Sequence, residues 1–599
     1  MKKKSMRRFQ LFAFLLLCST LAQAQGLPIY KIYRFHSGNF NQGGAEHHAF
    51  DPLSKRLFSS NAAQAQFDIL RIADLSKAGP IASIDLSAYG DRVNSIAVQG
   101  NNVAVAVQAS FAQSDGKVLF FDTNGTYINQ LVVGPKPKML SFSPSLQHLV
   151  VANEGIPSDD YSIDPAGTVS IINFSSGRAD NLSQADVQTV SFARYDTLPF
   201  DPKVLILGDN GNASFSEDVE PEHLAFNDAG NKVYVSLQEN NALAIIDLQT
   251  ASLDTVVGLG YKDYNLPGMG LDASDQSSSI KIENHFNLFG LYQPKAISYH
   301  SDASGSYILS ANEGESRNYS AFTDNERINN VNLNPIVFNS PSTLQNDTVL
   351  GRLRINTGIG NYNNPFIYDS LFTFGSRSFS IWNTSGQLIW DSGDEFEQTL
   401  SSLEAMNFNS SATSNNSFKI SSPEKGAEPK AICTGTYGGS NYAFIALEQM
   451  GGIMIYNIDN PAAPVFDSYL LDRDFSVAAS DSAAGDLGPE FMSYIKASDS
   501  PSGLPLLLVS NGVSGTLTIY QIGSGLSLNE EQWEALQAYP NPTSGPLSLS
   551  TKSSFKLYNS QGQYLGSFKN RDHIDLSVYA KGYYFLKSED GASLRVLKN

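Results

Sequence analysis

Residues 92–123 read RVNSIAVQGNNVAVAVQASFAQSDGKVLFFDT, and this stretch contains three short β-rich runs in succession. The runs are RVNSIAV, VAVAVQ and GKVLFFDT, and Gly, Asn, Ser or Asp residues stand between them. Short runs of β-branched and aromatic residues separated by turn-forming residues are typical of antiparallel strands joined by tight connections. The stretch therefore predicts a triplet of antiparallel strands.

The same triplet occurs seven times along the chain. Its third strand recurs at residues 67–75, 116–123, 167–174, 242–248, 377–383, 451–458 and 515–522. Most copies also have a fourth, outer strand. Regular repetition of such a unit predicts an all-β fold, a seven-bladed β-propeller spanning residues 25–522. An array of β-sandwiches is the weaker alternative, and the fifth blade is expected to carry an insertion at about residues 315–371.

The N-terminal end of this region supplies a strand without a blade of its own. Residues 29–33 (IYKIY) alternate like an outer strand, whereas the seventh blade stops at its third strand near Ile522. We expect residues 29–33 to become the fourth strand of the seventh blade. That pairing would close the ring and cover an open sheet edge.

The first 24 residues have the pattern of a cleavable signal peptide. A basic segment precedes an apolar stretch at residues 9–21, and the small-residue site AQA follows at residues 22–24. Cleavage would remove five basic residues and make the net charge of −19 more negative. This acidic balance argues against nucleic acid as a partner. No later run approaches 18 continuous apolar residues, so we expect no transmembrane segment in the mature chain.

A linker at residues 523–532 leads to a small C-terminal unit at residues 533–599. The unit contains YPNPTSG at residues 539–545, LYNSQGQ at 557–563 and KGYYFL at 581–586. Its strand and turn pattern predicts a small β-sandwich. These motifs resemble the type A C-terminal sorting domain of the type IX secretion system of Bacteroidota. The resemblance implies export across both membranes, the type IX secretion machinery as a partner, and a secreted or cell-surface location.

The repeat region also resembles a known family. Residues 151–155 (VANEG), 237–248 (LQENNALAIIDL) and 391–398 (DSGDEFEQ) carry much of the resemblance. They are similar to segments of the choice-of-anchor I family, and the similarity extends from about residue 34 to residue 522. The resemblance implies a secreted or surface propeller. Some family members carry alkaline-phosphatase-like labels, which adds a hydrolase to the functions to be considered.

Ionisable residues recur at equivalent positions of the triplets. In a propeller, each blade places the start of its inner strand and the loop between its second and third strands on one face of the central channel. Aligning the triplets predicts a ligand-binding ring at inner-strand starts formed by Glu46, Asn94, Lys138, Glu222, Lys295, Lys430 and Glu490. The loops add Glu154, Glu239, Glu313 and Glu448. Such a ring can hold an extracellular polar ligand or a cation, or it can bind only water and tie the blades together.

Three lysines interrupt the carboxylates of this ring. Lys138, Lys295 and Lys430 would neutralise neighbouring glutamates and repel a divalent cation. They favour an internal salt-bridge network or a pocket for an anionic ligand. Neighbouring residues of a strand point to opposite faces, so we also expect that Glu46 and His47 do not both face the channel.

Calcium is the cofactor that one further loop suggests. Asp159, Asp160 and Asp164 form a short acidic segment, and calcium prefers such oxygen ligands. Asx turns on a solvated loop are the alternative. The catalytic motifs G-x-S-x-G and H-E-x-x-H are missing from the sequence, and no catalytic residue is predicted. The sequence thus favours a binding or scaffolding protein, with a calcium-dependent phosphoesterase-like or lactonase-like hydrolase as the alternative.

Overall fold

The computed structural model describes residues 26–37, 40–523, 538–559, 564–588 and 593–599. The predicted signal peptide and nearly all of the predicted linker lie outside the described residues. The chain divides into two compact units, Met1–Gly523 and Ser524–Asn599. Each unit is described below by itself.

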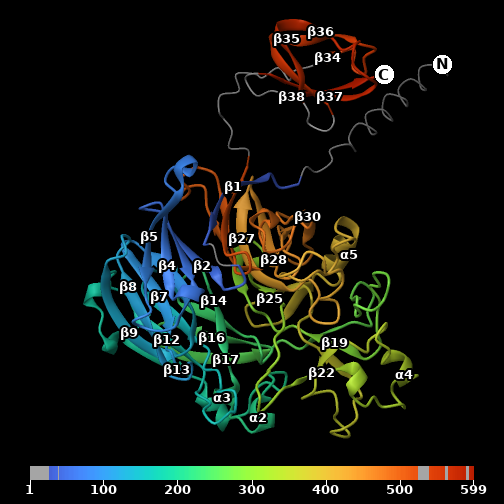
Figure 1. The fold of residues 1–599 in the computed structure, drawn as a ribbon. Coiled ribbons are helices and arrows are strands. Elements are labelled where there is room, and N and C mark those ends of the chain that lie inside the picture. Colours follow the sequence, from blue (N-terminus) through green and yellow to red (C-terminus); the bar gives the residue numbers. More distant parts are fainter. Residues whose placement is uncertain (1–25, 38–39, 524–537, 560–563, 589–592) are drawn as a thin grey trace, which may run out of the picture. The chain divides into compact units, whose positions relative to one another are not determined.

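Seven antiparallel four-stranded sheets make up most of the described first unit (Figure 1). The first is β2 (Gly44–Asp51), β3 (Arg56–Asn61), β4 (Gln66–Arg71) and β5 (Gly79–Asp85). The second is β6 (Arg92–Gln99), β7 (Asn102–Gln108), β8 (Asp115–Phe121) and β9 (Tyr127–Pro135). The third is β10 (Pro137–Phe142), β11 (His148–Asn153), β12 (Thr168–Asn173) and β13 (Val187–Ser191). The fourth is β14 (Pro221–Phe226), β15 (Lys232–Leu237), β16 (Ala242–Asp247) and β17 (Ser252–Gly258).

The remaining three sheets follow the same order. The fifth is β20 (Ile297–Asp302), β21 (Gly305–Ala311), β25 (Phe379–Asn383) and β26 (Leu388–Asp391). The sixth is β27 (Pro429–Tyr437), β28 (Ser440–Leu447), β29 (Ile453–Asn457) and β30 (Val465–Leu470). The seventh is β31 (Pro489–Ile495), β32 (Leu506–Asn511), β33 (Thr516–Ile522) and β1 (Ile29–His36).

The first strand of each sheet contacts the first strand of the next, and β31 of the seventh sheet contacts β2 of the first. The sheets therefore follow one another around a propeller-like ring. Apolar side chains fill the spaces between sheets, as where Val118 and Phe120 of β8 share a buried cluster with Leu149 and Val151 of β11. Burial of such side chains is the main favourable contribution to folding. The predicted all-β class and its repeated triplets are confirmed.

The N-terminal strand joins the last sheet, as predicted. β1, blue in Figure 1, runs antiparallel to β33, with Ile29 opposite Ile522 and His36 opposite Thr516. This pairing gives the seventh sheet its fourth strand from the opposite end of the sequence.

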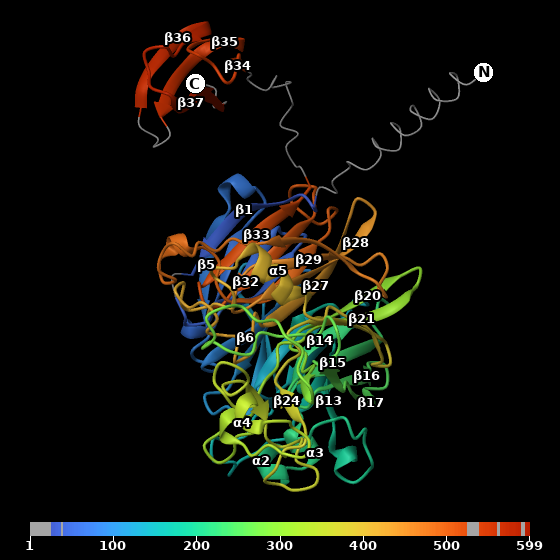
Figure 2. The same cartoon turned by 90° about the vertical axis from the view of Figure 1, so that its right-hand side faces the viewer.

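The fifth sheet carries a long insertion between β21 and β25. It contains β22 (Asn325–Arg327), α4 (Pro341–Leu344), β23 (Arg354–Asn356) and β24 (Leu371–Thr373). β24 pairs with β19 (Leu288–Leu291), which in turn pairs with β18 (Tyr261–Asp263), so residues before the fifth sheet join the insertion. The other helices are α2 (Gly208–Gly211), α3 (Phe215–Asp218) and α5 (Glu395–Leu403), and Figure 2 places α2 and α3 at the same end of this unit as α4.

The C-terminal unit differs from its predicted β-sandwich. β34 (Ala538–Tyr539), β35 (Pro546–Asn559), β36 (Tyr564–Asp575), β37 (Gly582–Ser588) and β38 (Ser593–Lys598) form one five-stranded antiparallel sheet. The first half of β35 pairs with β34 and its second half pairs with β37, while register shifts interrupt its pairing with β36. Such irregularities bend a strand. A single sheet thus curls into a near-barrel around one apolar cluster.

The third and fourth sheets approach so closely that Gly167→Ala is expected to destabilise the ring. A Cβ atom on Gly167 would lie 2.0 Å from the Val219 carbonyl oxygen and 2.8 Å from Pro221 Cδ. Relieving such an overlap requires backbone movement and costs about 1–3 kcal/mol. The measurement is thermal unfolding followed by circular dichroism. Gly79→Ala is the matched control, because nothing lies within 4 Å of its added Cβ. Equal melting midpoints for the two variants would contradict this contact.

Candidate functional site

The inner strands begin with an irregular register at the channel. The pairing shifts between Gly44 and His48 in β2, and between Pro137 and Met139 in β10. A bulge lets two consecutive side chains face the same side, because it interrupts the usual alternation. Glu46 and His47 both line one cavity. The expectation that they would point to opposite faces is therefore wrong, and the bulge is the reason.

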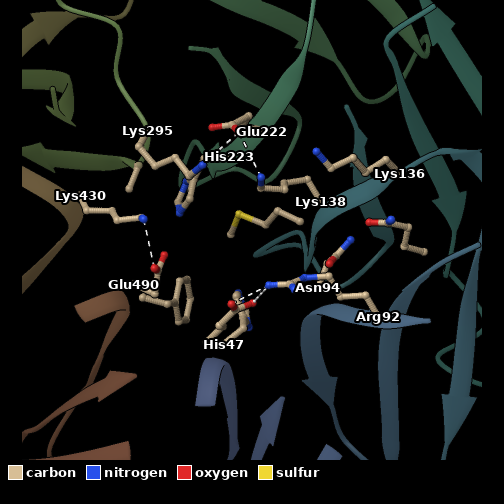
Figure 3. A pocket seen from close by; sticks show the side chains of 15 residues that line it. His47, Arg92, Asn94, Lys136, Lys138, Glu222, His223, Lys295, Lys430 and Glu490 are labelled. Carbon is tan, nitrogen blue, oxygen red and sulfur yellow. Dashed lines mark hydrogen bonds and ion pairs between the residues drawn. The ribbon is translucent and has the colours of Figure 1, made fainter. Parts of the chain in front are cut away.

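A cavity of about 400 Å³ lies at this end of the channel (Figure 3). All seven predicted inner-strand residues line it: Glu46, Asn94, Lys138, Glu222, Lys295, Lys430 and Glu490. Its other walls include Arg92, Lys136, His223 and Phe491. The four predicted loop glutamates do not belong to the residues that line it. Three of them, Glu154, Glu313 and Glu448, form ion pairs with the lysines.

One group of charges at the cavity, here called the basic sector, consists of Lys136, Lys138, Lys295 and Glu222, which line it, and of Glu154, which does not. Lys138 Nζ lies 3.3 Å from both a Glu154 and a Glu222 oxygen. Lys136 Nζ is 2.8 Å from Glu154, and Lys295 Nζ is 3.0 Å from Glu222. Burial acts against the charge of Lys138, but Glu154 and Glu222 outweigh it and raise the pKa of Lys138 well above its usual value. Three ammonium groups share two carboxylates in this sector.

The neighbouring group, the acidic sector, has the opposite balance. It consists of two lysines and four glutamates, of which only Lys430 and Glu490 line the cavity: Lys425, Lys430, Glu313, Glu428, Glu448 and Glu490. Lys430 Nζ lies 2.7 Å from Glu448, 3.0 Å from Glu490 and 3.6 Å from Glu313. Lys425 pairs with Glu313 at 3.3 Å and contacts Glu428. Burial and nearby carboxylates raise the pKa of Glu428 to about 8 against the effect of these lysines.

Two further groups of the predicted ring are held by neighbours. Arg92 Nη2 donates to both carboxylate oxygens of Glu46, each at 2.6 Å. The Asn94 amide donates to the Pro137 carbonyl oxygen at 2.9 Å, which ties the second sheet to the third. Arg92 thus neutralises Glu46, and Asn94 contributes to the joint between two sheets.

Glu239 belongs to a separate buried ion cluster around Arg317. Nε and Nη2 of Arg317 each lie 2.9 Å from an Asp218 oxygen, and Asp324 is 3.5 Å from Nη1. A Glu239 oxygen is 3.7 Å from Nε. Burial raises the pKa of Glu239 to about 8 despite Arg317, because Glu315 and Asp324 add their negative charge. The structure therefore does not place Glu239 among the residues that line the channel cavity.

Comparison with known families gives two matches along this chain. Residues 46–461, more than half of the chain, match the family described as Choice-of-anchor I domain. The chain belongs to this family. Residues 537–598 match the family described as Secretion system C-terminal sorting domain. The sorting domain implies interaction with the type IX secretion machinery and indicates export across the outer membrane, to the cell surface or beyond.

The choice-of-anchor I ring also has relatives in animals. The chain is 24% identical over 360 residues to a "Mesenchyme-specific cell surface glycoprotein" of Strongylocentrotus purpuratus, covering 54% of this chain and 46% of that protein. It is 26% identical over 242 residues to "Gigasin-3a" of Magallana gigas, covering 37% and 85%. This chain thus spans less than half the length of the sea urchin relative. Residues in the described part of the chain include no helix that is both long and apolar enough to cross a membrane.

The choice-of-anchor I ring is also similar to a solved β-propeller. This structure is the Cps50 (Swd1) β-propeller domain of Myceliophteria thermophila, with 10% identity and a TM-score of 0.39. The similarity covers 83% of this chain and 100% of that domain.

Alignment of the choice-of-anchor I triplets missed several charged residues of the site. Lys136 and Glu428 precede Pro137 and Pro429, and their φ angles of 47° and 62° lie in the left-handed region. This conformation is unfavourable for residues with a side chain and for residues before proline. The repeated pattern of a charged residue, Pro and a second charged residue was the signal for both. Arg317 and Lys425 lie outside the aligned strands, and nothing in the repeat indicates them.

Calcium does not fit the carboxylates nearest to one another at this channel. Among the described residues, Glu313, Glu428 and Glu448 offer oxygens within 4.8 Å of one another. The ammonium groups of Lys425 and Lys430 already pair with these three carboxylates. A divalent cation prefers several oxygen ligands and is repelled by ammonium groups at the same place. The set fits a salt-bridge network better than a metal site.

The residues of the predicted calcium loop make different contacts from one another. Asp160 accepts hydrogen bonds from Ser158 Oγ at 2.8 Å and Ser162 N at 3.0 Å, as in an Asx turn. Asp159 accepts from Ser320 N of the insertion at 2.9 Å. Burial, followed by the charge of nearby acidic residues, raises the pKa of Asp164 to about 7. Calcium binding by this loop stays a prediction.

Glu490→Gln is expected to stabilise the ring increasingly as the pH rises. Burial, with Glu448 and Glu46, raises the pKa of Glu490 to about 7 against the opposing effect of Lys430. A carboxyl group whose pKa rises on folding favours the native state while protonated, so that contribution is lost as pH rises from about 4.5 through 7. Gln does not ionise and escapes this loss, which is on the order of 1–3 kcal/mol. Melting midpoints from pH 5 to pH 9 should diverge, and a constant difference would contradict this prediction.

Proposed function

We propose that this protein is an exported surface or secreted binding protein whose channel cavity holds a small ligand with an anionic group. The observation that carries this proposal is the excess of ammonium groups in the basic sector. Lysine ammonium groups make strong, charge-assisted hydrogen bonds to carboxylate and phosphate oxygens. Glu154 and Glu222 leave one of the three ammonium charges unmatched. An anionic ligand would supply the missing negative charge.

The placement of the charges supports the same proposal. The side chains of Lys136, Lys138 and Lys295 are 19%, 31% and 20% exposed. The Glu154 and Glu222 side chains are only 6% and 7% exposed. The ammonium groups are therefore the more exposed charges of the basic sector, although Glu222 also lines the cavity. A ligand entering from solvent meets positive charge first, which favours anion binding.

The test is calorimetric titration of the mature protein with inorganic phosphate, sulfate and acetate. Lys138→Gln and Lys295→Gln are expected to weaken anion binding about tenfold, the loss typical of one charge-assisted hydrogen bond. Lys77→Gln is the control, because Lys77 is 79% exposed and pairs only with exposed Asp74 in the described structure. No binding of the three anions, or equal binding by all variants, would exclude this function.

The larger organisation completes the proposal. The seven sheets act as a closed seven-bladed propeller of residues 25–522, which serves as a rigid scaffold for the cavity. Residues 1–24 are removed as a signal peptide, and the type IX secretion machinery recognises residues 533–599 as the sorting unit. The name of the Strongylocentrotus purpuratus relative, which describes a cell surface glycoprotein, is in keeping with such a role.

A calcium-dependent phosphoesterase-like or lactonase-like hydrolase is the second candidate. The proximity of Glu313, Glu428 and Glu448 favours it, and the lysines among them oppose it. A hydrolase of this kind needs a metal-bound water or a general base at the ring. The test is metal content of the purified protein and turnover of a phosphomonoester with and without calcium. A metal-free, inert protein would exclude it, whereas turnover lost in Glu222→Gln and Glu490→Gln would overturn a role limited to binding.

A further inference from the structure

We propose that the ligand of this cavity is a small zwitterion, with an ammonium group as well as its anionic group. This inference rests on the proposed function and adds a place for the cationic end. That place lies between the seventh and first sheets, beside Glu490, Glu46 and Gly512.

Gly512 leaves room at this junction. In four other sheets, the loop between the second and third strands carries a glutamate at the corresponding point, but the seventh sheet has Gly512 there. A Cβ atom on Gly512 would lie 2.9 Å from Glu490 Cγ and 3.5 Å from Glu46 Cγ. Glycine therefore keeps side-chain atoms out of the space between two carboxylate-bearing side chains.

Charge at this junction is incompletely matched within the protein. Glu490 shares the single charge of Lys430 with Glu448 and Glu313. Once the pH exceeds the raised pKa values of Glu490 and Glu428, about 7 and about 8, the whole acidic sector has four carboxylates against two ammonium groups. Glu490 is half-buried, and a carboxylate that is partly withdrawn from water without a full counter-charge stabilises an added cation beside it. A ligand ammonium next to Glu490 would provide that charge, whereas Glu46 already has Arg92.

Glu490 and the basic sector lie on different sides of one cavity. In Figure 3, Lys136, Lys138 and Glu222 lie along the upper part of the view, and Glu490 and Arg92 lie along the lower part. All five residues line the same volume of about 400 Å³. This volume is within the range of small-molecule pockets. One small molecule can therefore place its anionic group on the basic sector and its ammonium group beside Glu490.

The test compares matched probes by titration of the mature protein. O-phosphoethanolamine is set against ethyl phosphate and ethanolamine, and γ-aminobutyrate against butyrate and butylamine. These two series distinguish a phosphate from a carboxylate as the anionic group. In each series that binds, the zwitterion is expected to bind about tenfold more tightly than the probe with the anion alone, because it gains one charge-assisted contact.

Two variants locate the ammonium group. Glu490→Gln removes its counter-charge, and Gly512→Ala fills its space, so each is expected to bring the affinity ratio of zwitterion to anion close to one. Gly79→Ala is the matched glycine control and should keep the ratio of the parent. Melting midpoints identify any variant that has lost its fold.

The outcomes separate this inference from the function on which it rests. Equal affinity of the parent for zwitterion and anion would overturn the zwitterion and leave anion binding intact. An unchanged ratio in folded Glu490→Gln and Gly512→Ala would overturn the cationic place at this junction. Failure of every anionic probe, inorganic phosphate included, would overturn the proposed function and this inference together.

Discussion

Deletion of residues 26–36 is expected to abolish cooperative unfolding of the ring unit. β33 would lose its antiparallel partner along the register from Ile29 to His36. Ile32, Tyr33 and Phe35 contact a buried cluster of the first and seventh sheets, and this contact would also disappear. The deletion would thus leave an unpaired strand edge and open an apolar cluster, and both changes are unfavourable. We expect a loss of more than about 4 kcal/mol, measured by circular dichroism and calorimetry.

A truncation at the other end provides the control for this deletion. Residues 524–599 form a separate compact unit, so their removal should leave the melting midpoint of the ring unchanged. The two truncated proteins would then differ in cooperativity as well as midpoint. An N-terminally shortened protein that melts cooperatively within a few degrees of the parent would show that the ring does not need β1.

Arg317→Met is expected to destabilise the ring by about 3–5 kcal/mol. The guanidinium group is 1% exposed and pairs with Asp218, Glu239 and Asp324. Methionine would fill much of the volume but leave three buried carboxylates without their shared cation. Removing one partner of a buried ion pair costs this much because the remaining charge stays desolvated. Thermal or denaturant unfolding at neutral pH measures the loss.

The pH dependence of this variant follows from the same carboxylates. Even in the parent, burial raises the pKa of Asp324 to about 6 and of Glu239 to about 8. Such groups stabilise the native state when they are protonated. This stabilisation is lost as the pH rises through these pKa values. Without Arg317 their ionised forms become still less favourable, so the loss should be smaller at pH 5 than at pH 9.

Arg178→Met is the matched control for Arg317→Met. Arg178 is 66% exposed and pairs with exposed Asp180. Exposed ion pairs contribute about 0–1 kcal/mol, so this variant should melt close to the parent at every pH. Similar losses for the two arginine variants would contradict the central place of Arg317 in its cluster.

Local signals explain why much of the ring is predictable from sequence. Each sheet begins with a turn-bounded strand triplet, and residues 29–33 alternate without a blade to join. The C-terminal sheet is less predictable, because β35 pairs with different strands along its length. Such pairing depends on the bend of one strand and on distant partners, and neither is visible in its own alternation of residues.

The site divides in the same way between repeated and unique features. Equivalent triplet positions occupy equivalent places around the channel, so Lys138, Lys295 and Lys430 could be assigned from alignment. The rule that neighbouring side chains of a strand point to opposite faces does not hold at Glu46 and His47, because a bulge changes where a side chain points. Arg317 depends on how the insertion lies against the ring, which no repeat pattern records.

The pairing of β1 with β33 also sets the order in which this ring can be completed. In each of the first six sheets the strands pair in chain order, although the insertion separates β21 from β25 in the fifth. The seventh sheet needs strands from both ends of the ring unit. β1 therefore has no partner until β33 has been synthesised or exported. Contacts between such distant segments slow folding. The seventh sheet is therefore completed last, because β1 gains its partner only once the chain has emerged through Ile522.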